Sequence, residues 1–140
     1  MGHPLVPLNG RSVRPRPLIP VTLIGPLDSW TDEGLLDTGS DDTIFPEGIA
    51  RRIGVDLTNA PSSRGAAIGM GVVPLRYAEV TLRVADNREQ HEWVGWVGFT
   101  PAKLRHATLG FAGFLPYFTA TFLGDREEVE LAVNSLYPGT

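Results

Sequence analysis

The sequence predicts a single domain that is mainly β, and three observations lead to this class. The chain has 140 residues, 42% of them hydrophobic, which suits one compact domain. Sixteen glycines and twelve prolines disfavour long helices and favour short strands joined by tight turns. Residues 80–84 alternate apolar and polar side chains with the period of two that a half-buried strand requires.

The N-terminal residues differ in composition from the rest of the chain. Residues 1–20 hold five prolines and three arginines but no acid, so all 16 acidic side chains lie in the remainder. A backbone this rich in proline prefers extended or polyproline II geometry. We therefore predict an arm over residues 1–17 and a folded domain over residues 18–140. The arm is either a disordered leader or a segment that packs on the domain or on a second subunit.

The domain is expected to open with two strands. The first begins at Leu18 and ends at Gly25, because glycine and the proline after it terminate the apolar run. The polar residues 28–33 are then expected to form a turn into the apolar residues 34–36. On this interpretation Asp37 lies at the point where a buried strand ends.

A short helix is predicted after a segment rich in aspartate. Pro46 suits the first helical position, and Gly54 suits the position just past the last turn. Ile49, Ala50 and Ile53 lie on one face at helical spacing. The helix is therefore expected to bury that face.

The remaining chain predicts hairpins. Residues 64–84 are expected to form two strands hinged on residues 68–71, where glycines permit the positive φ of a hairpin tip. After a turn at Asp86, residues 92–99 predict a strand that two glycines interrupt. Residues 117–133 predict a final hairpin whose apolar face closes the core.

Composition argues against several classes of function. A net charge of -4 and a pI near 5.3 favour neither a nucleic-acid partner nor a membrane partner, so neither is predicted. The chain has no cysteine and only three scattered histidines, so we predict no metal site and no cofactor. No apolar run approaches a membrane span, and the N-terminus lacks the apolar segment of a secretory signal. We therefore expect a cytoplasmic protein.

Three carboxylates, Asp37, Asp41 and Asp42, follow the predicted buried strand. An EF-hand loop that began at Asp37 would need glycine at its sixth position and glutamate at its twelfth, but Asp42 and Gly48 stand there. A phosphatase-type nucleophilic aspartate would need alternating strands and helices, which the sequence does not predict. Both interpretations fail.

Four segments together resemble the retropepsin family of aspartic proteases. LLDTGSDDTIFPE (35–47) resembles the active-site segment, in which an apolar pair precedes Asp-Thr-Gly, and AIGMGV (67–72) resembles the flap tip. WVGFTPAKL (96–104) resembles the strand and loop that line the substrate pockets, and ATLGFAGFLPYFTATF (107–122) resembles the second, glycine-bearing motif of bacterial retropepsin-like domains. The resemblance implies a single-lobe acid-protease fold, which is a closed β-barrel with a flap hairpin and one or two short helices.

The number of Asp-Thr-Gly triplets implies half a catalytic site. The triplet occurs once, and the only other Asp-x-Gly, at residues 32–34, lacks both the hydroxyl and the preceding apolar pair. A second copy of the chain must then supply the other aspartate, and a twofold axis near Asp37 would bring the two loops together. The resemblance thus implies a homodimeric aspartic endopeptidase, similar to retroviral proteases, that acts on an extended peptide or protein substrate.

The chemistry of this family requires two aspartates. Two carboxylates about 3 Å apart repel by about 5 kcal/mol at an effective dielectric constant of 20, so the pair holds one proton. The ionised oxygen takes a proton from water while the protonated partner donates to the scissile carbonyl. We expect peptide hydrolysis to be fastest at mildly acidic pH. The alternative is a binding or assembly module that keeps the fold without turnover.

The resemblance also implies roles for individual residues. Asp37 is the catalytic residue, and its scaffold consists of Thr38, Gly39, Ser40 and Gly110. Thr38 would bond across the dimer axis and Ser40 would bond Asp37, and the alternative for both is an ordinary turn residue. The residues implied in substrate binding are Gly39, Asp41, Asp42, Ile44, Ile68, Gly69, Met70, Gly71, Thr100, Pro101 and Leu109. Simple solvation is the alternative for Asp41 and Asp42, and a place in the core is the alternative for Ile44.

The second motif departs from the family pattern at one position. Retroviral members usually have arginine after its glycine, where it pairs with the acid that matches Asp41, but here Gly110 is followed by Phe111. The predicted C-terminal hairpin also differs from the intermingled terminal strands of viral dimers. We therefore expect a dimer interface that is built differently, with the Pro-rich arm as one candidate.

Overall fold

The computed structural model describes residues 16–67 and 71–139, which form a mainly β domain with 55% strand and 8% helix. The elements in chain order are β1 (Leu18–Ile24), β2 (Ser29–Leu36), β3 (Ile44–Pro46), α1 (Glu47–Ile53), β4 (Ser62–Ala67), β5 (Gly71–Ala85), β6 (Gln90–Thr100), β7 (Ala107–Leu109), the 3-10 helix η1 (Leu115–Tyr117), β8 (Phe118–Leu123) and β9 (Glu128–Val133). Of the predicted arm, only Arg16 and Pro17 are described. The Pro17 carbonyl accepts a hydrogen bond from the Leu36 N–H at 3.0 Å, so Pro17 already contacts the sheet.

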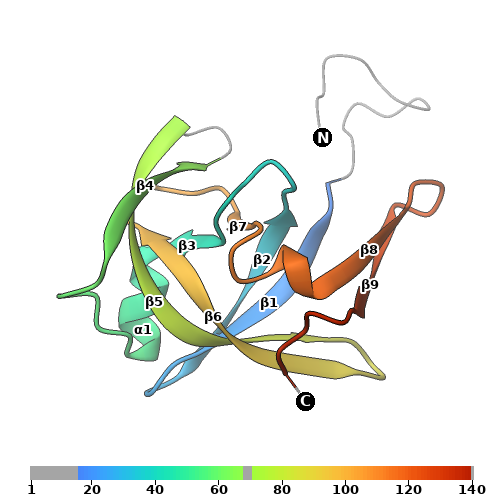
Figure 1. The fold of residues 1–140 in the computed structure, drawn as a ribbon, viewed down its shortest axis with the longest axis horizontal. Coiled ribbons are helices and arrows are strands. Elements are labelled where there is room, and N and C mark those ends of the chain that lie inside the picture. Colours follow the sequence, from blue (N-terminus) through green and yellow to red (C-terminus); the bar gives the residue numbers. More distant parts are fainter. Residues whose placement is uncertain (1–15, 68–70, 140) are drawn as a thin grey trace.

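Six strands form a closed barrel in the order β1-β2-β7-β3-β6-β5, which β5 closes by pairing with β1 (Figure 1). β4 extends from this ring as the partner of the first half of β5. β2 is parallel to β7, and β7 is antiparallel to β3. β7 therefore lies between two strands that follow each other in the chain. This arrangement positions residues 37–43, which connect β2 to β3.

The expected turn over residues 28–33 is wrong, because most of these residues belong to β2. Trp30 pairs with Leu23, and Thr31 pairs with Thr22 so that their hydroxyl oxygens lie 2.7 Å apart. The chain reverses earlier, where the Gly25 N–H donates to the Asp28 carbonyl at 2.9 Å. The polar side chains suggested a turn because much of this hairpin faces solvent, which an antiparallel strand tolerates.

The predicted interruption of the Trp-rich strand is also wrong, because β6 runs unbroken through Gly95 and Gly98. A Cβ atom on Gly95 would lie 3.2 Å from the Gly113 carbonyl oxygen. A Cβ atom on Gly98 would lie 3.3 Å from the Tyr77 ring. The two glycines therefore let neighbouring segments approach the strand closely and do not break it.

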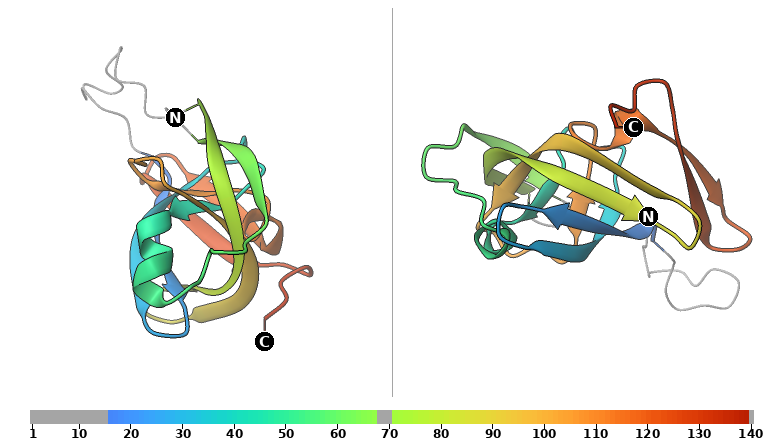
Figure 2. Two further views of the ribbon diagram at one scale, coloured as in Figure 1. Left: turned by 90° about the vertical axis from the view of Figure 1, so that its left-hand side faces the viewer. Right: turned by 90° about the horizontal axis from the view of Figure 1, so that it is seen from below.

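The short helix is confirmed to within one residue. α1 begins at Glu47, because Pro46 is the last residue of β3. Gly54 ends the helix in the left-handed conformation with φ of 85°, as a C-terminal glycine commonly does. α1 lies on the outside of the barrel and buries its apolar face there (Figure 2), a face made of Ile49, Ala50 and Ile53.

Both predicted hairpins form. β4 and β5 pair antiparallel from Ser62 and Arg76 to Ala67 and Gly71, and the expected tip at residues 68–70 lies outside the described residues. β8 and β9 form a separate two-stranded sheet on the side of the barrel away from α1 (Figure 1). This second hairpin closes the core only in part, because Phe118 is 8% exposed whereas Phe122 is 51% exposed.

Two hydrophobic clusters hold the elements together. The larger fills the barrel and includes Trp93, which is 3% exposed and makes edge-to-face contacts with Phe114 and Phe118. The smaller cluster joins β3 to the β4–β5 hairpin and has Tyr77 packed against it; its buried members are Ile44, Val73 and Leu75. The start of β3 is therefore anchored to the hairpin.

Candidate active site

The predicted catalytic segment, residues 37–43, begins where β2 runs parallel to β7. Leu36 pairs with Leu109 in this ladder. The Asp37 N–H continues the pairing by donating to the Leu109 carbonyl at 3.0 Å. The predicted position of Asp37 at the end of a buried strand is therefore confirmed, and the barrel itself holds its backbone.

The turn after Asp37 orients its carboxylate. Its Oδ1 atom accepts a hydrogen bond from the Gly39 N–H at 2.9 Å, and the Ser40 N–H donates to the Asp37 carbonyl at 3.2 Å. The Asp37 side chain is half-buried, whereas Thr38 and Gly39 are exposed. The barrel thus presents an oriented carboxylate beside open backbone, and such a group can exchange protons with a ligand.

The second predicted motif packs against this turn. The Phe111 N–H donates to the Ser40 carbonyl at 3.0 Å, and the Ala112 N–H donates to the Asp41 carbonyl at 2.8 Å. A Cβ atom on Gly110 would overlap the Asp42 carbonyl oxygen and would lie 2.7 Å from the Ser40 carbonyl oxygen. Only glycine permits this approach. The fold therefore brings together two predicted scaffold segments that are far apart in the sequence.

Ser40 does not make the hydrogen bond expected of it. Its hydroxyl donates to the Asp42 carbonyl at 2.8 Å and accepts from the Asp42 N–H at 3.3 Å. The expected partner, the Asp37 carboxylate, instead bonds the Gly39 N–H. The serine hydroxyl turns toward Asp42 because the side chain is buried beneath the segment, at 4% exposure, where the backbone groups of Asp42 need partners.

Thr43 is a structural residue of the site that sequence reasoning missed. Its side chain is 1% exposed. Its hydroxyl donates to the Ala112 carbonyl at 2.7 Å and accepts from the Gly110 N–H at 3.3 Å. The sequence does hold one signal, because Thr43 stands directly before the apolar run that starts at Ile44. A hydroxyl next to a buried run is itself often buried, and a buried hydroxyl needs a hydrogen-bond partner.

Tyr77 is a second residue that sequence reasoning missed. Its hydroxyl donates to Asp42 Oδ1 at 3.2 Å. Burial raises the pKa of Tyr77 above its ordinary value of 10.0, and the negative charge of Asp42 raises that pKa further. No local signal could have found this contact, because 35 positions separate the two residues.

The residues predicted to contact substrate fall into three groups. Those that are exposed are Gly39, Asp41, Gly71 and Pro101, while Asp42 is half-buried. Those that are at most 1% exposed are Ile44, Thr100 and Leu109. The expected flap-tip residues Ile68, Gly69 and Met70 lie outside the described residues. The exposed group offers surface to a ligand, whereas the buried group forms the core beneath the segment.

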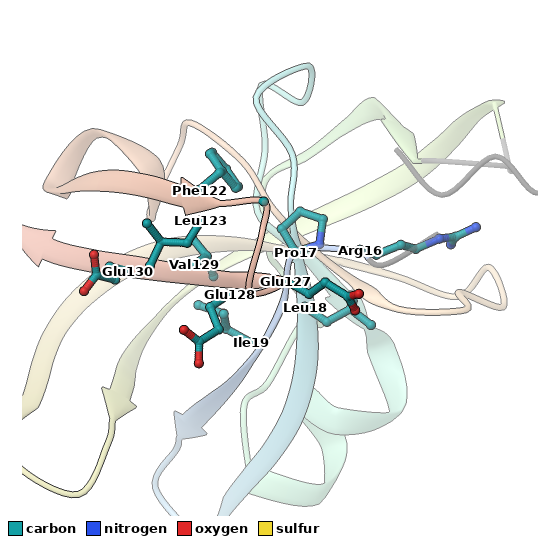
Figure 3. Close-up of a pocket in the computed structure, with 11 residues that line it drawn as sticks. Arg16, Pro17, Leu18, Ile19, Phe122, Leu123, Glu127, Glu128, Val129 and Glu130 are labelled. Carbon is teal, nitrogen blue, oxygen red and sulfur yellow. The ribbon is translucent and has the colours of Figure 1, made fainter. Parts of the chain in front are cut away.

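A cleft of about 460 Å³ lies away from this segment, between the start of β1 and the β8–β9 hairpin (Figure 3). Its apolar wall includes Leu18, Phe122 and Val129, and the carboxylates of Glu128 and Glu130 stand at its rim. None of the described residues predicted for the catalytic site lines it. We place the candidate active site at Asp37 and not in this cleft, because a cavity alone, without an oriented reactive group, does not indicate a catalytic site.

Within residues 16–67 and 71–139, no cluster of three or more His, Asp, Glu or Cys side chains is arranged to hold a metal ion. In the same ranges, no helix has the length and apolar character needed to cross a membrane.

No protein-family model matches the chain, and no curated protein sequence matches it. The functional proposal therefore rests on residues 37–43 and the side chains that contact them.

Proposed function

We propose that this protein is a retropepsin-like aspartic endopeptidase that works as a homodimer, with one Asp37 from each subunit. The observation that carries the proposal is the Asp37-Thr38-Gly39 turn at the end of β2, whose carboxylate is oriented by the Gly39 N–H at 2.9 Å. The turn lies where β7 pairs with both β2 and β3, and Gly110 packs against the residues that follow the turn. Motif and geometry together favour an acid-protease site over a solvated turn.

A second subunit is needed because the sequence contains one Asp-Thr-Gly. A twofold axis close to Asp37 would place two equivalent carboxylates side by side, because an isologous interface pairs each surface with its own copy.

Phe111 supports an interface near Asp37. It follows Gly110, its N–H bonds the Ser40 carbonyl, and it is 49% exposed. Aromatic side chains of this kind are enriched at the cores of protein interfaces.

The two carboxylates would divide the catalytic work. Repulsion between them keeps one proton on the pair, so one oxygen acts as base and another carries the acidic proton. The base removes a proton from a water molecule that attacks the scissile carbonyl, and the acid protonates the carbonyl oxygen. As the C–N bond breaks, the carboxyl that took the proton from water gives it to the leaving amine, and a hydroxyl of the tetrahedral intermediate returns a proton to the other carboxylate. Because water is the nucleophile, no covalent intermediate with the protein forms.

The substrate would bind as an extended strand between residues 37–43 and the β4–β5 hairpin. Gly39 is exposed and has no side chain, so a peptide backbone can approach the carboxylate of Asp37. Asp41 is exposed beside it and offers a carboxylate to main-chain N–H groups of the peptide.

The decisive experiment compares hydrolysis of an apolar peptide library at about pH 4 to 6 by the wild type and by Asp37→Asn. The asparagine side chain keeps the shape and can still accept the Gly39 N–H, so the variant should fold. We expect hydrolysis to fall at least about a thousandfold, because the two aspartates act as a unit. Asp32→Asn, in the other Asp-x-Gly, is the matched control and should stay active.

Two outcomes would contradict the enzyme proposal. Equal hydrolysis by the wild type and by Asp37→Asn would place the chemistry elsewhere. Absence of cleavage by the wild type under every condition would favour the other candidate, a binding or assembly module that keeps the fold without turnover.

A further inference from the structure

Both strands of the β4–β5 hairpin come close to Asp42, which belongs to the candidate active-site segment, residues 37–43. From β5, the Tyr77 hydroxyl donates to Asp42 Oδ1 at 3.2 Å. From β4, the Ser63 side chain lies close to Tyr77, where it slightly offsets the rise in the pKa of that residue that burial and then Asp42 cause. Also on β4, a Cβ atom on Gly65 would lie 3.1 Å from Asp42 Oδ2, so the strand passes close to the second carboxylate oxygen. The Asp42 carboxylate therefore accepts a hydrogen bond from β5 and lies close to β4.

Packing fixes the position of Tyr77. Its N–H donates to the Pro61 carbonyl at 2.9 Å, just before β4 begins. Its ring lies over Gly98, where a Cβ atom would come within 3.3 Å of it, and it packs against the small cluster that joins β3 to the hairpin. A ring held on several sides delivers its hydroxyl to Asp42 from one direction.

The backbone of Asp42 is held by neighbouring residues of the candidate site. Its N–H and carbonyl both bond the Ser40 hydroxyl, and it forms a parallel bridge with Ala112. The carboxylate meets a neutral phenol, whereas the ion pairs of Arg76 and Arg83 go to glutamates. A hydrogen bond to an ionised carboxylate is stronger than one between neutral groups.

We infer that Tyr77 is a positioning residue that couples the β4–β5 hairpin to the candidate active-site segment through Asp42. In the proposed enzyme a bound peptide lies between these two elements, so the hydrogen bond sets the gap that the peptide enters. The kinetic consequence rests on the proposed function. The structural consequence depends on the Tyr77–Asp42 contact alone.

The structural consequence is tested by amide hydrogen exchange in the full chain. Tyr77→Phe removes the hydroxyl and keeps the ring. We expect residues 62–67 and 71–76 to exchange about fivefold faster in this variant, which corresponds to the loss of one hydrogen bond. Tyr117→Phe is the matched control, because Tyr117 contacts Trp93 in the barrel cluster. In this control variant the β4–β5 hairpin should exchange as it does in the wild type. Unchanged exchange in Tyr77→Phe would overturn the inference.

The kinetic consequence is tested by steady-state hydrolysis. We expect Tyr77→Phe to raise KM about tenfold and to change kcat less than about twofold, because the Asp37 pair keeps its geometry. Asp42→Ala removes the acceptor of the same hydrogen bond, so the double variant should be no worse than Asp42→Ala alone. A lower kcat with unchanged KM would overturn the positioning role. If the wild type cleaves nothing, the proposed function fails, while hydrogen exchange still decides the inference.

Discussion

Gly110 determines how closely the two segments of the candidate site approach each other. It is buried, and a Cβ atom there would overlap the backbone carbonyl of Asp42. A change of rotamer cannot relieve an overlap with backbone. The Asp42 backbone is in turn held by its bridge to Ala112, so the strain would spread into the site.

We predict that Gly110→Ala lowers the free energy of unfolding by about 3 kcal/mol, at the upper end of the usual range for overpacking. Urea denaturation measures the change. Gly124→Ala in the turn between β8 and β9 is the control, because nothing lies within 4 Å of its Cβ position, and its stability should stay within about 1 kcal/mol of the wild type. Equal stability of the two variants would contradict the close approach at Gly110.

Tyr77 makes stability depend on alkaline pH. Its pKa is raised above 10.0 by burial and then by the charge of Asp42. Because the pKa in the folded state exceeds that in the unfolded state, this contribution is complete below about pH 10 and is lost as pH rises through the folded-state pKa. We predict that thermal stability falls more between about pH 9 and pH 11 in the wild type than in Tyr77→Phe. Parallel pH profiles of the two proteins would refute this prediction.

At the level of elements, Thr43 joins β3 to its neighbours around the candidate site. Its hydroxyl bonds the Ala112 carbonyl and the Gly110 N–H in the connection between β7 and η1. Its carbonyl accepts from the Gly98 N–H of β6 at 2.8 Å. One buried residue therefore links β3 to β6 and to the connection that follows β7.

We predict that Thr43→Val lowers the free energy of unfolding by about 2 to 3 kcal/mol. Valine has nearly the same shape, but it removes the partner of the Ala112 carbonyl and leaves the Gly110 N–H buried without its hydrogen bond to Thr43. Thr43→Ser keeps the hydroxyl and should cost only about 1 kcal/mol, from the lost methyl group. Chemical denaturation of both variants makes the comparison, and a larger loss in the serine variant would show that packing, and not hydrogen bonding, dominates.

At the level of the whole molecule, barrel closure leaves one Asp37 turn at the surface of each chain. β1, β2, β7, β3, β6 and β5 pair in a ring, so the turn at the end of β2 is held firmly but meets no second turn of its kind within the described residues. The proposed chemistry therefore requires association of two chains. Activity should then depend on which chains meet.

We predict that mixing wild-type and Asp37→Asn chains suppresses activity beyond simple dilution. In an equal mixture that exchanges freely, about a quarter of the dimers carry two aspartates, so activity per wild-type chain should fall to about half. Peptide hydrolysis at constant total protein concentration measures the effect, and Asp32→Asn chains serve as the matched control. Unchanged activity per wild-type chain would indicate that one chain acts alone.

Within the barrel, local sequence patterns accounted for the features that depend on near neighbours. Pro46 and Gly54 bracketed α1 to within one residue, and glycines marked the β4–β5 hairpin. The polar start of β2 predicts a turn, and this prediction is wrong because its side chains do not indicate the pairing with β1. Gly95 predicts a break, and this prediction is wrong because the role of Gly95 depends on Gly113, which approaches it from another element.

Local patterns in the sequence were enough to predict that the domain is mainly β and that Asp37 follows the apolar residues 34–36 at the end of a strand. Both follow from side-chain periodicity and backbone preference over a few residues. The order of β2, β7 and β3, and the hydrogen bond from Tyr77 to Asp42, emerged only in the three-dimensional fold. These contacts join distant positions, and their geometry is set by how the barrel closes, which no local pattern specifies.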